Sequence, residues 1–146
     1  MSNIDLNIYS DFVDSVMSNK SKSLEEFIEV LRNLEQNGIN TPLLNTAAIG
    51  LSGEGGEFSD IVKKLFFQGK PITEDVKIHL FKELGDIIFY WTTACKALGF
   101  NPDEVIAGNQ TKLSARYPNG FSAVKSENKA KNDLWNTNLT KKNSKN

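Results

Sequence analysis

Apolar residues along most of this chain recur every three to four positions, the spacing that places them on one face of an α-helix. Leu24, Phe27, Ile28, Leu31 and Leu34 follow this spacing. Alternation with a period of two, which indicates strands, is almost absent, and no Asn-Gly or Asp-Gly pair separates two alternating runs. The pattern therefore predicts an all-α protein.

Residues that begin and end helices divide the chain into about five helical segments. Ser23-Leu-Glu-Glu26 predicts a capping box, in which Glu26 reaches back to the amide of Ser23. Thr41 is expected to cap a helix that has Pro42 at its first position. Short connections between long helices favour antiparallel neighbours, so we expect an antiparallel helical bundle. The expected helices cover approximately residues 5–18, 23–37, 41–68, 73–99 and 101–117.

The domain organisation follows from where this periodicity ends. A chain of 146 residues suits one modest hydrophobic core, and we expect a single all-α domain over residues 1–125. From residue 126 onward Lys, Asn, Ser and Thr dominate and the helical spacing is lost. Residues 126–146 are therefore expected to form a mostly disordered polar tail.

Composition and charge exclude several classes of protein. The formal net charge of -1 provides no global basic field, so we expect no nucleic-acid partner. The single cysteine, Cys95, cannot form an intrachain disulfide, which suits a reducing cytoplasm. The start of the chain lacks the basic and apolar regions of a secretory signal, and no apolar run approaches the length of a membrane span, so no membrane partner is expected.

Two pairs of carboxylates are the main candidates for chemistry. Glu54-Gly-Gly-Glu57 lies in the third expected helix and Glu83-Leu-Gly-Asp86 in the fourth. Residues three apart on a helix are surface neighbours, with Cβ atoms roughly 5–6 Å apart. If the two helices pack antiparallel, the pairs can face each other and form a cluster of four acids. Such a cluster needs cations, and its oxygen ligands suit Mg²⁺, for which Mn²⁺ can substitute.

A helical projection tests whether these acids belong to an ordinary solvated face, which a single Glu-x-x-Glu most often does. His79, Glu83, Asp86 and Tyr90 fall within a stripe roughly 60° wide that borders the apolar face of the helix. An unpaired charge at such a border is costly, and metal ligation is a physical reason to keep it there. Glycines within both motifs weaken the helices and point to close helix approach or to room for a ligand: Gly53, Gly55, Gly56 and Gly85.

The ordered series of motifs resembles the MazG-like nucleotide pyrophosphohydrolases, specifically the single-domain proteins often found in bacteriophages. The resemblance covers approximately residues 41–128. Its most specific part is Glu-x-x-Glu, then 25 residues, then Glu-x-x-Asp. The remaining matching segments are Gly50 to Gly53, Asp60 to Lys64, Phe67 to Gly69, Tyr90, Asn109 with Lys112, and Arg116 to Phe121.

The resemblance implies Mg²⁺-dependent hydrolysis of (deoxy)nucleoside triphosphates to the monophosphate and pyrophosphate, in the cytoplasm (the host's, if the protein is phage-encoded). It also implies a homodimer or homotetramer. Glu54, Glu57, Glu83 and Asp86 would be the metal ligands. Either Glu54 or Glu57 would also accept a proton from the attacking water.

Further residues are candidates for substrate contact. Lys64 projects on the side of Glu57, whereas Lys63, one position earlier, is as consistent with an ordinary surface lysine. Lys112 and Arg116 lie four apart on one helix face and suit phosphate. Two other candidates are less specific: Asn109 for phosphate or sugar, and Tyr90 for a base or sugar, with core packing equally open. Asp60 is expected to support the metal ligands without binding the metal itself.

Other functions remain open at the level of the sequence. The same fold could serve as an inactive nucleotide-binding or regulatory module, or hydrolyse alarmones that resemble guanosine tetraphosphate. A carboxylate-bridged redox bundle is disfavoured, because such sites usually add Glu-x-x-His pairs and the one histidine, His79, is not in one. The nucleobase is not determined.

Overall fold

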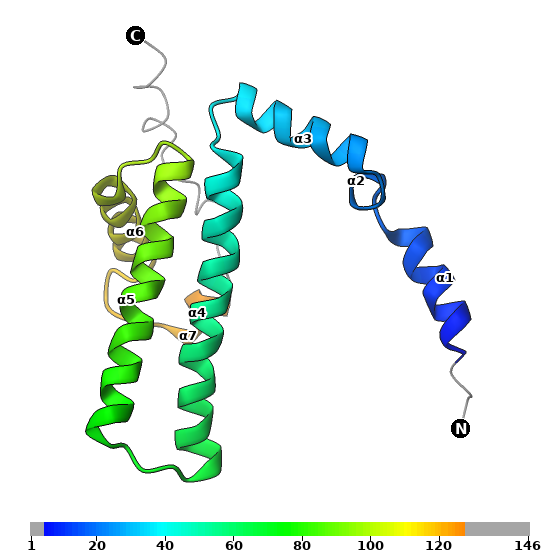
Figure 1. The fold of residues 1–146 in the computed structure, drawn as a ribbon. Coiled ribbons are helices and arrows are strands. Elements are labelled where there is room, and N and C mark those ends of the chain that lie inside the picture. The colour runs from blue at the N-terminus through cyan, green and yellow to red at the C-terminus, as the bar shows by residue number, and fades with distance from the viewer. Residues whose placement is uncertain (1–4, 128–146) are drawn as a thin grey trace. The chain divides into compact units, whose positions relative to one another are not determined.

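The structure is a computed structural model that describes residues 5–127, and every regular element within that range is a helix. The all-α prediction is therefore confirmed, with α2 and α7 as two short helices that the apolar spacing did not predict. Helices of four and five residues are too short to display a periodic pattern. The helices are α1 (Leu6–Val16), α2 (Asn19–Lys22), α3 (Leu24–Gln36), α4 (Thr41–Gln68), α5 (Glu74–Ala97), α6 (Pro102–Arg116) and α7 (Ala123–Glu127) (Figure 1).

The chain divides into two compact units, residues 1–99 and residues 100–146. The first unit contains α1 to α5, and the second contains α6 and α7. The single domain expected over residues 1–125 stays a prediction. Of the expected polar tail, residues 126 and 127 complete α7, and residues 128–146 lie outside the described part of the chain.

The first unit is built around a hairpin of its two longest helices, α4 and α5, with 28 and 24 residues (Figure 1). Gly69 ends α4 in the left-handed region, with φ at 64°, and Thr73 begins α5 by accepting a hydrogen bond from the amide of Val76. At the other end of the hairpin the amide of Asn40 donates to the carbonyl of Ala97, with 3.0 Å between the two atoms. The two helices therefore run antiparallel, as expected.

Two expected helix caps differ in the structure. Asn40, not Thr41, caps α4, because its side chain accepts from the amide of Leu43. Thr41 instead donates from its amide and its hydroxyl to the carboxylate of Glu35, and these hydrogen bonds lower the pKa of Glu35. They join the end of α3 to the start of α4.

The capping box at the start of α3 is only half formed. The side chain of Ser23 accepts from the amide of Glu26, as predicted. The amide of Ser23, however, donates to the carbonyl of Asn19 in α2, so Glu26 has no free amide to reach back to. The unpredicted helix α2 is the physical reason for this difference.

Close approach of the two long helices depends on Gly50. A Cβ atom added to Gly50 would lie 2.3 Å from two carbons of the Tyr90 ring, far inside van der Waals contact. At Gly53, Gly55, Gly56 and Gly85 the glycines were expected to allow either close helix approach or room for a ligand, and among the described residues nothing comes within 4 Å of a Cβ added at any of them. Close packing therefore explains Gly50, and the other glycines leave open space.

Few side chains in the described residues are buried. Those of Ala47, Cys95 and Ala97 are buried apolar groups, and Cys95 is a free thiol, as expected. Large apolar side chains on α4 and α5 stay exposed, including Phe66 and Phe81. None of the described helices combines the length and the apolar character needed to cross a bilayer.

The contact between Gly50 and Tyr90 makes a prediction about stability. Gly50→Ala should destabilise the protein by about 1–3 kcal/mol, since overpacking forces the Tyr90 ring or the helices to shift. Gly53→Ala is the matched control and should stabilise α4 by about 0.5–1 kcal/mol, because its Cβ meets open space. The measurement is urea unfolding followed by circular dichroism. Equal effects of the two substitutions would show that Gly50 does not hold the helices together.

Candidate metal and nucleotide site

Three carboxylates meet between α4 and α5. One carboxylate oxygen from each of Glu54, Glu57 and Glu83 lies within 4.8 Å of the other two. Glu54 and Glu83 are half-buried between the helices, and Glu57 is exposed at the edge. The structure thus brings together three of the four acids that the sequence singled out, and they come from both motifs.

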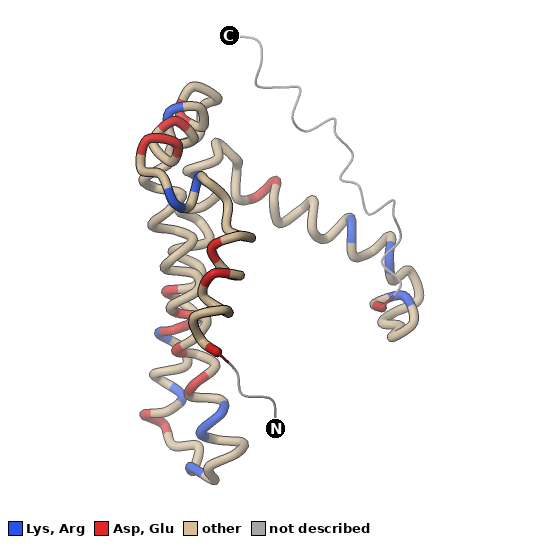
Figure 2. Tube along the Cα trace, turned by 90° about the vertical axis from the view of Figure 1, so that its right-hand side faces the viewer, with Lys and Arg blue, Asp and Glu red and all other residues tan. Residues whose placement is uncertain are grey.

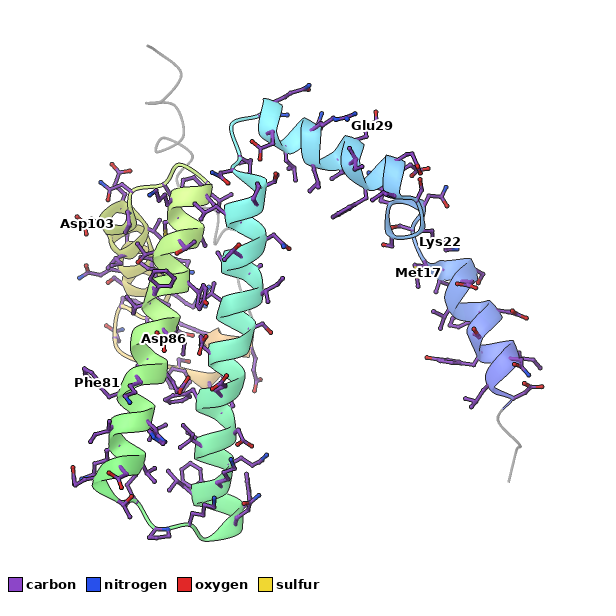
Figure 3. All side chains as sticks on the ribbon, in the orientation of Figure 1. Met17, Lys22, Glu29, Phe81, Asp86 and Asp103 are labelled. Carbon is purple, nitrogen blue, oxygen red and sulfur yellow. The ribbon has the colours of Figure 1, made fainter. Side chains whose placement is uncertain are left out.

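The fourth acid, Asp86, lies close to this group on α5 (Figure 3) without belonging to it. Its negative charge is one of the causes that raise the pKa of Glu54. The larger causes are partial burial, which comes first, and the charge of Glu57. A hydrogen bond with Glu83 and the charge of Glu83 raise the pKa of Glu54 further. These four acids repel one another when ionised.

Glu83 shows most directly that the carboxylate cluster lacks a binding partner. Its Oε2 atom is buried and has no hydrogen-bond partner among the described residues. A hydrogen bond between Glu54 and Glu83 requires a proton on one of the two carboxyls. When both carboxyls are ionised, neither can donate to the other. A buried carboxylate oxygen without a donor carries a desolvation cost that a cation would remove. The residues present therefore fit a hard divalent cation.

A groove of about 790 Å³ runs beside these carboxylates between the two helices. Gly53 and Gly56 form part of its floor on α4, where the missing side chains leave room. Its polar lining includes Glu57 and Glu83 together with groups of opposite charge. The groove is large enough for a ligand of the size of a nucleotide.

Asp60 has a different role from the neighbouring acids. It forms ion pairs with Lys63 and Lys64, and hydrogen bonds from these two lysines lower its pKa to about 2. It is not one of the three clustered carboxylates. Lys64 is half-buried and lines the groove with Glu57, as the helical projection predicted, whereas Lys63 does not line it.

The remaining candidates are one residue of α5 and three residues of α6. The ring of Tyr90 packs against Gly50 and meets Phe89 edge-on, with ring centroids 5.1 Å apart. Asn109, Lys112 and Arg116 are all on α6, in the second compact unit. Arg116 lies over the ring of Tyr117, at 5.8 Å from its centroid. Contact of these residues with substrate stays a prediction.

Comparison with models of protein families shows which family the chain matches. The model of the MazG nucleotide pyrophosphohydrolase domain matches residues 43–121, more than half of the chain. This chain belongs to the MazG family. The match includes both carboxylate motifs, the groove between them and the whole of α6. Comparisons with curated proteins and with solved structures give no match.

Membership of the MazG family supports a hydrolase that acts on nucleotides. It also accounts for the possible metal site, since the acidic cluster lies inside the matched residues. Helices α1, α2 and α3 all precede the match, so the family does not explain them.

Sequence reasoning missed two features of this site. Gly50 was counted only as part of a motif, although it sets the approach of the helices. Lys82 lines the groove next to Glu83 but was not singled out. Its signal was its position one residue before an acidic motif, which by itself does not distinguish a groove residue from a solvated lysine.

The geometry of the three clustered carboxylates predicts how substitution affects metal binding. Glu83→Gln should weaken Mn²⁺ binding by about tenfold or more, since it removes a ligand oxygen and even partners of ligands have effects of that size. Glu29→Gln, an exposed acid on α3, is the control and should leave the affinity unchanged. Isothermal titration with Mn²⁺ measures both. Equal affinities would place the cation elsewhere.

Proposed function

We propose that this protein hydrolyses (deoxy)nucleoside triphosphates to the monophosphate and pyrophosphate with the help of Mg²⁺ or Mn²⁺. The observation that carries the proposal is the buried, unpartnered oxygen of Glu83 inside a cluster of like charges, within the part of the chain that matches the MazG family. A triphosphate is strongly anionic and approaches such a cluster only when divalent cations lie between them.

Glu54, Glu57 and Glu83 are the proposed metal ligands, with Asp86 beside them as the fourth. A divalent cation bound there supplies Lewis acidity and lowers the pKa of water. One of Glu54 and Glu57 accepts the proton of the water that attacks the α–β phosphoanhydride. Water adds its hydroxyl group to one phosphorus, and the bridging oxygen leaves with the other. Asn109, Lys112 and Arg116 are proposed to contact the substrate from α6.

A panel of nucleotides incubated with Mg²⁺ tests this reaction. The expected products are the monophosphate and pyrophosphate in equal amounts, resolved by ion-exchange chromatography. Glu54→Gln and Asp86→Asn should each abolish turnover with little change in helicity, because they remove negative charge and leave the helices intact. Release of orthophosphate alone, or full turnover in either variant, would contradict the proposal.

We also propose that the active protein is a homodimer or a homotetramer. Phe81, Leu84 and Ile88 form an apolar stripe on α5, and their exposed fractions are 78%, 51% and 60%. Figure 3 shows Phe81 on the side of α5 that faces away from α4. The α5 stripe therefore lies outside the groove, and a protein surface is the simplest cover for it.

Sedimentation analysis tests the oligomer. The wild-type protein should have a mass that is a multiple of 16.3 kDa. Ile88→Glu should lower this mass and reduce stability, because it places a charge in the covered stripe. Lys77→Glu, an exposed position on the same helix outside the α5 stripe, is the control and should change neither. A wild-type protein of 16.3 kDa that melts cooperatively would show that the chain covers the stripe by itself.

A further inference from the structure

The charges on the α4–α5 hairpin are distributed unevenly along its length. Between the start of α4 and residue 62, and again between Glu83 and Cys95, neither helix carries a lysine or an arginine. Apart from Lys96 at the far end, every cation of the hairpin lies between the carboxylate cluster and the turn. These cations are Lys63, Lys64, Lys70, Lys77 and Lys82, and Figure 2 shows them gathered toward that end of the hairpin.

Part of this cationic region belongs to the groove. Lys64, His79 and Lys82 line it together with the acids Glu57, Asp60 and Glu83. Lys64 is seven residues beyond Glu57 on α4, which places it about 10 Å closer to the turn. A smaller adjoining cavity of about 150 Å³ extends the same region to Lys70. Lys64, His79 and Lys82 are called the turn-side end of the groove below.

Of the two lysines that line the groove, Lys82 is the one available to a ligand. Lys64 already forms an ion pair with Asp60. Lys82, by contrast, forms no ion pair or hydrogen bond with any of residues 5–127, although the carboxylate of Glu83 is next to it in sequence. A lysine that faces a groove and is not neutralised by the protein suits an anionic group.

The opposite end of the hairpin is apolar and aromatic. Starting from the carboxylates and moving away from the turn, α4 reaches Gly50 and α5 reaches Tyr90, and the two are in contact. Tyr90 is half-buried. Gly50 and Tyr90 carry no charge, and an aromatic ring suits a sugar or a base and not a phosphate.

We propose that these two ends determine the direction in which a nucleoside triphosphate binds. Its β- and γ-phosphates lie at the turn-side end, against Lys82, His79 and Lys64, and its nucleoside lies toward Gly50 and Tyr90. The α–β bond then lies beside the carboxylate cluster. This inference rests on the proposed function and adds to it the site that holds the leaving pyrophosphate. Lys82 is a substrate-positioning residue in this arrangement.

Equilibrium binding in the presence of Mg²⁺ tests the direction without relying on turnover. The ligands are an α,β-methylene nucleoside triphosphate, inorganic pyrophosphate and the nucleoside monophosphate. Lys82→Ala should weaken binding of the triphosphate analogue and of pyrophosphate by about 10- to 150-fold, the effect of losing one hydrogen bond to a charged group. Binding of the monophosphate should change less than about twofold, because it lacks the two phosphates concerned.

Lys77→Ala is the matched control. Lys77 has the same charge, lies on the same helix and on the same side of the carboxylates, but it pairs with Glu74 and does not line the groove. Its removal should leave the affinities for all three ligands unchanged. Tyr90→Leu should give the reverse pattern to Lys82→Ala, with weaker binding of both nucleotides and unchanged binding of pyrophosphate.

The outcomes separate this inference from the proposed function. Equal weakening of monophosphate and triphosphate by Lys82→Ala would overturn the proposed direction, even if the wild-type protein hydrolyses nucleotides. A wild-type protein that hydrolyses nothing but shows the expected pattern of binding would support the direction and refute the enzymatic activity. Failure of the wild-type protein to bind the triphosphate analogue or pyrophosphate would overturn both.

Discussion

Mutual repulsion among acids held between two helices is the constraint on which the site depends. Glu54 and Glu83 are partly removed from water, and Glu57 and Asp86 add charge beside them. In water the repulsion between two unit charges at 4 Å is about 1 kcal/mol, and it becomes several times larger near a protein surface. Proteins relieve such repulsion with protons or with metal ions. The raised pKa of Glu54 favours relief by a proton. The buried oxygen of Glu83, which has no hydrogen-bond partner among the described residues, suits relief by a metal ion.

The hairpin geometry determines the order in which groups lie along the proposed binding site. Because α4 and α5 run antiparallel, Glu57 and Glu83 lie at one level while Gly50 and Tyr90 meet at another. The close approach at Gly50 holds the helices together at one end of the groove. Toward the turn, Lys64 and Lys82 line the groove together with Asp60. A single pair of helices thus places an aromatic group, a carboxylate cluster and a cationic region in a fixed order.

The same hairpin leaves apolar surface that the described residues do not cover. The α5 stripe faces away from the groove, so an additional protein surface can cover it without obstructing the substrate. The arrangement separates two requirements on α5. In the proposed function, one side of the helix would supply ligands and substrate contacts, and the other would supply the hydrophobic burial that a chain with so few buried side chains needs.

Much of this protein could be predicted from the sequence because its signals are local. The start of α4 follows from Pro42 and its end from Gly69, and the pairing of acids within each motif follows from the helical repeat. One cap was misplaced by a residue, and α2 took the amide that Glu26 was expected to use. These are contacts between neighbouring segments, which a pattern within one helix does not contain.

Only the tertiary structure decided which residues of the two helices meet. The sequence identified four carboxylates as equals, whereas packing grouped three of them and set Asp86 beside the group. It left open whether the four glycines of the motifs allow close approach or room for a ligand, whereas the structure places the close approach at Gly50 and open space at the four. The physical reason is that the helical repeat determines the face on which a side chain lies. The distance between two faces depends on the packing of both helices at once.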